Sequence, residues 1–337
     1  MLRAKSSMQH QRVGIIGIGA AGLQHARAVI HCGHSVDAVA VECSTSNNIK
    51  YIKDIAPDAR IIVGHEVLIE DDSLDAFVVA LPWDIIPKVL PDLLKSNKPM
   101  LIEKPIGLTA SEIETALAKN HMGIDSKLIG FNRRFYDVVS RLKTRLDKGG
   151  LKSAHIIISE DIGRQKTAHG DTIVPHLISF SSSHTLDLAV YLLGTLSIVK
   201  LYGWRDKSQF ISINGLLETE QGLPTHLSLN ASDPSSVGLR FIFSDSTTWV
   251  LSPLEMLSVF DRYEIVEISQ NSKIRRYMPH VSEIVNEPVD YKPGFMAQMD
   301  AFLSGNFGPG ASVHDALNTQ KFIESIQSSA NVNLREG

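Results

Sequence analysis

Apolar positions follow two patterns along residues 12–133. Short runs of consecutive apolar residues recur in "RVGII", "SVDAVAVE", "ARIIVG", "DAFVVALP", "PMLIEKP" and "KLIGFNRRF". Runs of this length predict strands buried on both faces. Segments with helical spacing separate them, such as "IIPKVLPDLLKS" and "TASEIETALAKN". This alternation of strands and helices predicts an α/β domain built on a doubly wound parallel sheet.

The pattern of predicted strands and helices changes after residue 133. The segments "AHIIISE", "SIVKLYGW", "QFISINGLLE", "THLSLNAS", "GLRFIFSD" and "STTWVLS" read as strands with few helices between them. Such runs predict an α+β domain with a large, mostly antiparallel open sheet. We therefore predict a disordered tail over residues 1–11, a first domain over 12–133 and a second domain over 134–337 that binds substrate and forms oligomers.

Composition narrows the class of protein. The chain has 337 residues, a formal net charge of −4 and no apolar run long enough to span a bilayer. The charge argues against a dedicated nucleic-acid binder, and we expect no membrane partner. The two cysteines have no spacing typical of a disulfide framework or a metal site, and the histidines match no metal motif. We expect a cytoplasmic protein that holds no metal.

The turn after the first strand has the pattern of a dinucleotide-binding site. Gly17, Gly19 and Gly22 permit, in order, a tight turn, close approach of backbone to a pyrophosphate, and close packing of helix on strand. Ala20 and Ala21 lie between them, at the start of the predicted helix, whose amides face the phosphates. This turn predicts a Rossmann domain.

An acidic residue follows the second strand. Glu42 lies about 20 residues beyond the last glycine, the spacing of a carboxylate that binds the ribose hydroxyls. A carboxylate there repels a 2′-phosphate, so we expect NAD as cofactor. Ser44, Thr45 and Lys50 leave NADP open.

The carboxyl ends of the other predicted strands carry further candidates. In doubly wound sheets ligands bind at this edge, which places Leu81, Pro82, Trp83, Glu103 and Lys104 beside the cofactor. Lys104 can donate a hydrogen bond to a substrate hydroxyl and stabilise developing negative charge. On spacing alone, a solvated lysine paired with Glu103 is an equally good interpretation.

Several motifs together resemble the glucose–fructose oxidoreductase, inositol dehydrogenase and rhizopine catabolism (Gfo/Idh/MocA) family. They are "GIGAAGLQHA", "VVALPWD", "EKPIGLTASE", "GFNRRF", "SHTLDLAVYLLG", "YKPGFMAQMDAFL" and "SVHDALNTQKFIESIQSS". The resemblance implies NAD(P)-dependent oxidation or reduction of sugars, cyclitols or nucleotide sugars. It implies that Lys104 and His184 are catalytic and contact the substrate, and that the protein forms a dimer or tetramer. Arg133 is a further candidate for the substrate site.

The stretch before His184 departs from the family pattern. The family has an aspartate three or four residues earlier, where this chain has Ser181 and Phe180. His184 is expected in the first turn of a helix with Ser183 as N-cap. Two alternatives to a sugar dehydrogenase therefore stay open: a cofactor-binding regulator without catalysis, and a reductase of an imine or a bilin-like substrate.

Overall fold

The computed structural model describes residues 9–119, 123–206, 209–231, 233, 237–269 and 272–336. It divides into two compact units. The first comprises Met1–Phe135 and Val289–Lys321, and the second comprises Tyr136–Pro288 and Phe322–Gly337.

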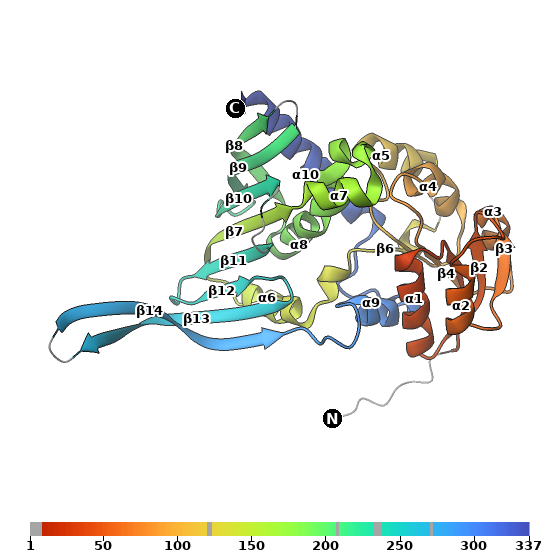
Figure 1. Ribbon diagram of the computed structural model, residues 1–337, viewed down its shortest axis with the longest axis horizontal. Helices are drawn as coiled ribbons and strands as arrows, with labels where there is room; N and C mark the ends of the chain where they lie inside the picture. Colours follow the sequence, from red (N-terminus) through yellow and green to blue (C-terminus); the bar gives the residue numbers. More distant parts are fainter. Residues whose placement is uncertain are drawn as a thin grey trace. The chain divides into compact units, whose positions relative to one another are not determined.

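The first unit is built on a six-stranded sheet in the order β3-β2-β1-β4-β5-β6, with every neighbouring pair parallel (Figure 1). This is the strand order of dinucleotide-binding Rossmann domains. The strands are β1 (Arg12–Ile16), β2 (Ser35–Val41), β3 (Arg60–Val63), β4 (Ala76–Val79), β5 (Met100–Ile102) and β6 (Lys127–Ile129). The helices are α1 (Ala20–His31), α2 (Ile49–Ile55), α3 (His65–Ile69), α4 (Ile86–Lys95), α5 (Ala110–Lys119) and α9 (Phe295–Leu303), with 3₁₀ turns η1 (Ile124–Ser126) and η2 (Asn132–Phe135).

Both faces of this sheet are buried, which explains why its strands read as unbroken apolar runs. Side chains of one parity, such as Ile16 and Val79, pack against α4 and α5. Those of the other parity, such as Ile15 and Val78, pack against α1 and α9. The predicted doubly wound parallel sheet is confirmed.

The second unit holds a nine-stranded sheet in the order β14-β13-β12-β11-β7-β10-β9-β8-β15. Its pairs are antiparallel except β7 with β10 and β8 with β15. The mostly antiparallel open sheet is therefore confirmed. The strands are β7 (Leu151–Glu160), β8 (Leu196–Asp206), β9 (Gln209–Thr219), β10 (Pro224–Ala231), β11 (Gly238–Phe243), β12 (Thr248–Leu251), β13 (Met256–Ser269), β14 (Ser272–Asn286) and β15 (Leu334–Glu336).

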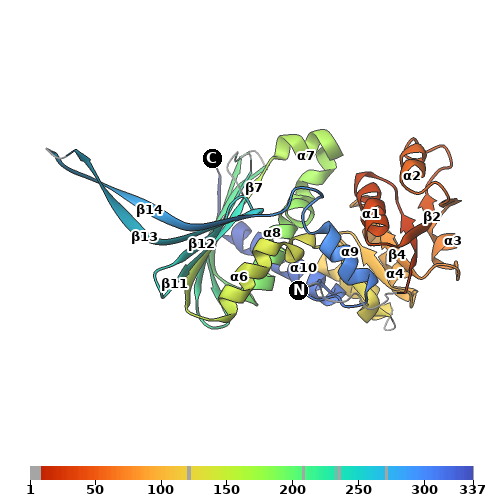
Figure 2. The same ribbon diagram turned by 90° about the horizontal axis from the view of Figure 1, so that it is seen from below.

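One face of this sheet carries the core of the second unit. Apolar side chains of α6 (Asp137–Asp147) and α8 (Ser183–Leu193) pack on it, and Figure 2 shows both helices on that side. The second half of α10 (Val313–Val332) contributes Ile323 and Ile326 to the same core. The β13–β14 hairpin extends beyond its neighbours and exposes Tyr263 and Tyr277.

The predicted boundary between the domains differs from the structure. We assigned all of 134–337 to the second domain, whereas Val289–Lys321 belongs to the first unit. The physical reason is apolar packing that local sequence does not reveal. Met299 and Phe302 of α9 are buried in the same cluster as Val29 of α1, and the two helices lie side by side in Figure 1.

The predicted disordered tail is also partly corrected. Residues 1–8 lie outside the described residues. Residues 10 and 11 are tied to the loop before β2: the His10 ring lies 3.0 Å from the Gly33 carbonyl oxygen, and the Gln11 amide donates to His34 Nδ1. The ordered chain therefore begins before residue 12.

A buried lysine closes the amino end of β6. Lys127 is 1% exposed, and its Nζ donates to the carbonyl oxygens of Ser96, Lys98 and Gly123 at 2.7, 2.9 and 3.0 Å. One ammonium thus bonds to carbonyls of two connecting segments, and the Gly123 carbonyl also accepts from the Ser126 hydroxyl at 2.7 Å.

We predict that Lys127→Met destabilises the first unit by about 2–4 kcal/mol, because methionine fills the space but removes the donor to the carbonyls of Ser96 and Lys98. Urea denaturation followed by circular dichroism measures the change. Lys119→Met, at an exposed position of α5, is the control and should change stability by less than about 0.5 kcal/mol. Equal stability of both variants would show that the carbonyls do not depend on Lys127.

Candidate cofactor and active site

The glycine turn after β1 has the geometry of a phosphate cradle. Gly17 has a φ of +90°, and a Cβ there would lie 2.5 Å from the Ala80 carbonyl oxygen. A Cβ at Gly22 would lie 2.0 Å from the Gly17 carbonyl oxygen, whereas one at Gly19 would meet no atom within 4 Å. Gly17 and Gly22 are thus required by close packing, and the open space at Gly19 is where a pyrophosphate fits.

The helix that follows turns its free amides toward that space. α1 begins at Ala20 with Gly19 in the N-cap position, and Ala20 and Ala21 form its first turn. The first amides of a helix lack partners within it, and they favour an anion. These residues fit the phosphates of a dinucleotide.

The remaining predicted cofactor residues follow neighbouring strands of the sheet. Glu42 comes directly after β2 and is exposed. Leu81, Pro82 and Trp83 follow β4, and Glu103 follows β5. Because β2, β1, β4 and β5 are adjacent and parallel, their carboxyl ends form one edge of the sheet. The structure thus brings these residues and Lys104 to the edge that carries the glycine turn.

Glu103 lies in a network that we did not predict. Its Oε1 lies 2.8 Å from Nε2 of His25, and its side chain is only 14% exposed. His25 is fully buried and stacks on Phe295 with ring centroids 4.6 Å apart. It is packed, but it also binds a residue of the candidate site.

Two lysines place positive charge near this carboxylate. Burial alone would raise the pKa of Glu103, but the hydrogen bond from His25 and the charges of Lys292 and Lys104 together lower it. Lys292 was missed by sequence reasoning. It comes from the segment before α9, where its Nζ lies 4.1 Å from the centroid of the Phe295 ring.

The two arginines of η2 have different surroundings. Arg134 is 5% exposed, and its Nη2 lies 3.8 Å from Oδ1 of Asp315. It therefore belongs to the core of the first unit. Arg133 is half-buried, and its charge acts on Lys292. Arg133 therefore stays the candidate for binding a substrate or phosphate group.

His184 lies in the second unit, on a helix that does not start where we predicted. A 3₁₀ segment (Asp171–His176) and a π-helical turn (Ile178–Ser182) lead directly into α8. Ser183 has helical angles, φ −54° and ψ −35°, so it is not an N-cap. π-helical turns are frequent at functional sites.

The residues around His184 differ in their exposure to solvent. Phe180, Ser181 and His184 are half-buried, whereas Ser182, Ser183 and Asp187 are buried. Phe180, one of the two positions where the family pattern has an aspartate, meets the His169 ring edge-on with centroids 4.9 Å apart.

Besides Asp187 on the same helix, a second buried carboxylate comes from another element. Glu160, the last residue of β7, accepts a 2.6 Å hydrogen bond from the Ser182 hydroxyl. The sequence gave no signal for this pairing, because 22 residues separate the two side chains.

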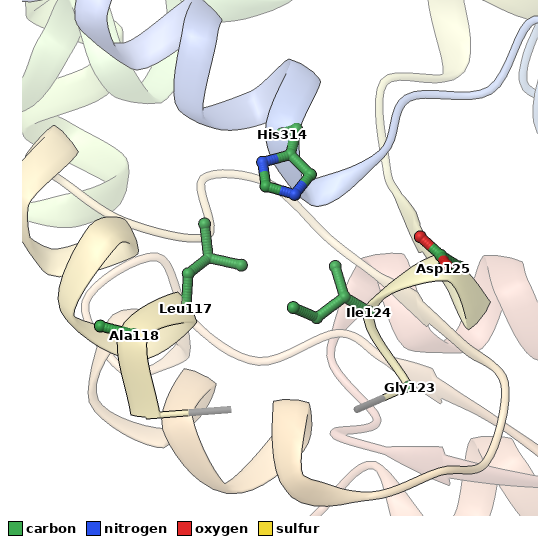
Figure 3. Close-up of a pocket in the computed structure, with 6 residues that line it drawn as sticks. All are labelled: Leu117, Ala118, Gly123, Ile124, Asp125 and His314. Carbon is green, nitrogen blue, oxygen red and sulfur yellow. The ribbon is translucent and has the colours of Figure 1, made fainter. Parts of the chain in front are cut away.

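A hollow elsewhere in the first unit is not the cofactor site. It has a volume of about 430 Å³ and is lined by Leu117, Ala118, Gly123, Ile124, Asp125 and His314 (Figure 3). These residues precede β6 or begin α10, at the amino end of the strand rather than its carboxyl end. Within the described part of the chain, no group of three or more metal-binding side chains exists and no helix is long and apolar enough to cross a membrane.

Comparisons with known proteins agree with the fold and with a nicotinamide cofactor. Residues 11–121 match the family described as "Oxidoreductase family, NAD-binding Rossmann fold" (GFO_IDH_MocA). The chain is 29% identical over 185 residues to an inositol 2-dehydrogenase of Acidothermus cellulolyticus, a match that covers 55% of this chain and 54% of that relative. It thus spans about half the length of that relative. It is 24% identical to an inositol 2-dehydrogenase of Corynebacterium glutamicum over 86% of this chain and 82% of the relative.

Solved structures share the fold over nearly the whole chain. A levoglucosan dehydrogenase in complex with NADH has a TM-score of 0.72 at 14% identity, covering 97% of this chain and 98% of the other. A myo-inositol 2-dehydrogenase from Lactobacillus plantarum has a TM-score of 0.70 at 16% identity, with coverage of 97% and 98%. At these identities the likeness shows the fold alone. Residues 11–121 thus match the Gfo/Idh/MocA family of NAD-binding oxidoreductases, and the glycine cradle lies within the matched segment.

Proposed function

We propose that this protein is an NAD-dependent dehydrogenase that acts on a secondary alcohol of a sugar, a cyclitol or a nucleotide sugar. The observation that carries the proposal is the position of Lys104, directly after Glu103 at the strand edge that holds the glycine cradle. The relatives support the substrate class, since their names include inositol 2-dehydrogenase and levoglucosan dehydrogenase.

The residues of this chain divide the work of the reaction. NAD, when bound, supplies the nicotinamide that accepts a hydride from the alcohol carbon. Lys104 binds the reacting oxygen and stabilises its developing charge. His184 takes the hydroxyl proton during oxidation and returns it during reduction. Arg133 supports binding of a polar or anionic part of the substrate.

A regulator that binds cofactor without catalysis is the second candidate. It is favoured by the departure at Phe180 and Ser181, where the family has a carboxylate. However, the buried carboxylate of Glu160 accepts a hydrogen bond from Ser182, two residues before His184. This supports the hypothesis of a catalytic protein. A measurement of turnover distinguishes the dehydrogenase from the regulator.

We also propose that the protein acts as a homo-oligomer in the cytoplasm. On the uncovered face of the second unit's sheet, Ile157, Tyr202 and Trp204 are 36%, 41% and 42% exposed. A second copy of the chain would remove this apolar surface from water. Cys32 and Cys43 are not joined in a disulfide, which suits a reducing compartment.

The proposed activity is tested by mixing the protein with NAD and a panel of cyclitols, sugars and nucleotide sugars, beginning with myo-inositol. We expect NADH absorbance to appear with at least one of them. Lys104→Ala should remove turnover while its affinity for NADH stays within a few-fold of the wild type, because the ammonium acts on the substrate oxygen. NADH binding without turnover of any compound would favour the regulator.

The role of His184 is tested in the same assay. His184→Asn should lower turnover by roughly a hundredfold, the usual contribution of a positioned acid–base group. The profile of turnover against pH should also lose an ionisation. His226→Asn, on the exposed face of β10, is the matched control and should leave both unchanged. A wild-type profile for His184→Asn would exclude His184 as the proton carrier.

Cofactor preference is tested at Glu42. We expect calorimetric titration to show tighter binding of NADH than of NADPH by tenfold or more, because the carboxylate accepts ribose hydroxyls and repels a 2′-phosphate. Glu42→Ala combined with Cys43→Arg should narrow or reverse the difference. Glu66→Ala, another exposed acid of the first unit, should not. Preference of the wild type for NADPH would contradict this role.

A further inference from the structure

We propose that the buried His25–Glu103 pair holds Glu103 as an anion beside Lys104, so that Lys104 acts in the reaction as a fixed ammonium and does not carry the proton. The inference deepens the proposed function and rests on it for the role of Lys104. Its structural part concerns the first unit alone and is tested without any substrate. His25 and Glu103 are positioning residues, since they act through Lys104.

The imidazole of His25 is held in one orientation and one protonation form. Its Nε2 faces Glu103 at 2.8 Å. Its Nδ1 is buried and, among the described residues, has no hydrogen-bond partner. A proton on Nδ1 would be a buried donor without an acceptor, which is costly. The proton therefore lies on Nε2, and His25 donates it to Glu103 (the tautomer follows from these contacts).

Stacking fixes the ring further. His25 is fully buried, and the Phe295 ring lies against it with an angle of 21° between the planes. Phe295 opens α9, which returns to the first unit from residues far along the chain. The donor that faces Glu103 is thus held from two separate segments.

The backbone of β6 closes the other side of the carboxylate. A Cβ at Gly130 would lie 2.8 Å from Glu103 Oε2, so only a glycine leaves room for this side chain. The Gly130 amide in turn donates to the Ile102 carbonyl oxygen at 2.8 Å. Glu103 therefore lies in a rigid site rather than on a flexible loop.

The charges around Glu103 favour its ionised form. The groups that face it are His25, Lys104 and Lys292, and Arg133 adds positive charge next to Lys292. A buried carboxylate with a hydrogen-bond donor and two ammonium groups near it stays ionised at neutral pH. The same attraction acts in reverse and keeps Lys104 protonated.

This charge state decides what Lys104 does in the reaction. In the oxidation of an alcohol, the carbon loses a hydride with its two electrons to the cofactor, and the hydroxyl loses a proton as the carbonyl forms. An ammonium that keeps all its protons can donate a hydrogen bond to the oxygen but cannot accept the proton. The proton then passes to a neutral base, the role that we propose for His184.

The ionisation of Lys104 is measured by competitive acylation with acetic anhydride between pH 7 and pH 11, with the peptides quantified by mass spectrometry. Lys119, an exposed lysine of the same unit, is the internal reference. Glu103→Gln removes the negative charge and keeps the shape of the side chain. We therefore expect Lys104 to react about tenfold faster near pH 8, which corresponds to a decrease of about one unit in the pKa of Lys104. Circular dichroism and thermal denaturation confirm that each variant folds.

His25 gives a second and independent pair of variants. His25→Leu removes the donor, and we expect faster acylation of Lys104 in the same direction as Glu103→Gln. His25→Gln keeps an N–H donor and should stay within about twofold of the wild type. A merely structural role of His25 would not distinguish the two variants in the reactivity of Lys104.

The outcomes decide the proposal. If Glu103→Gln folds and Lys104 is acylated at the wild-type rate, the proposal is overturned. If Glu103→Gln does not fold, a wild-type rate in His25→Leu overturns it instead. Failure of the proposed function has a different signature. It would appear as a wild type without turnover in the panel, while the acylation of Lys104 still responded to Glu103 and His25.

Discussion

A carboxylate that is nearly buried at the edge of a parallel sheet needs a donor and nearby positive charge, and this constraint organises the candidate site. Glu103 meets it with a 2.8 Å hydrogen bond to His25 and with the charges of Lys104 and Lys292. These groups come from the end of β5, from α1 and from the segment before α9. One local electrostatic requirement therefore joins the glycine turn, the strand edge and the returning C-terminal segment.

The same edge carries the cofactor cradle for an unrelated reason, the close packing of backbone. Gly17 and Gly22 have no room for a side chain, and Gly19 leaves an open face in front of the amides of α1. α1 then contributes in two ways: its first turn faces the phosphates, and its buried face presents His25 to Glu103. A single helix thus links binding of the dinucleotide to the residue that precedes Lys104.

Much of the fold could be read from the sequence because its signals are local. Unbroken apolar runs indicate strands buried on both faces, and the glycine spacing reports close contacts within a few residues. Long-range packing gave no such signal. The return of Val289–Lys321 to the first unit depends on contacts between α9 and α1, so nothing local in the sequence indicated that this segment belongs there.

The candidate site shows the same division. Gly17, Glu42 and Lys104 follow strands, so their placement at one edge was predictable from the order of elements. His25 is separated from Glu103 by 78 residues. The available hint was a polar residue on the buried face of α1, between Gly22 and Ala26. Lys292 lies in the motif "YKPGFMAQMDAFL", but nothing in that motif indicated that it approaches Glu103. In the second unit, the π-helical turn before His184 replaced the helix start that we expected, because the chain is already helical from Asp171 onward.

The protonation of His25 tests the central claim most directly. Long-range ¹H–¹⁵N correlation spectra of the ¹⁵N-histidine-labelled protein at pH 7.5, assigned by comparison with His25→Gln, report which ring nitrogen carries the proton. The account predicts a neutral imidazole with its proton on Nε2 and a bare Nδ1. A proton on Nδ1 with a bare Nε2 would contradict it, because His25 would then have no hydrogen to donate to Glu103.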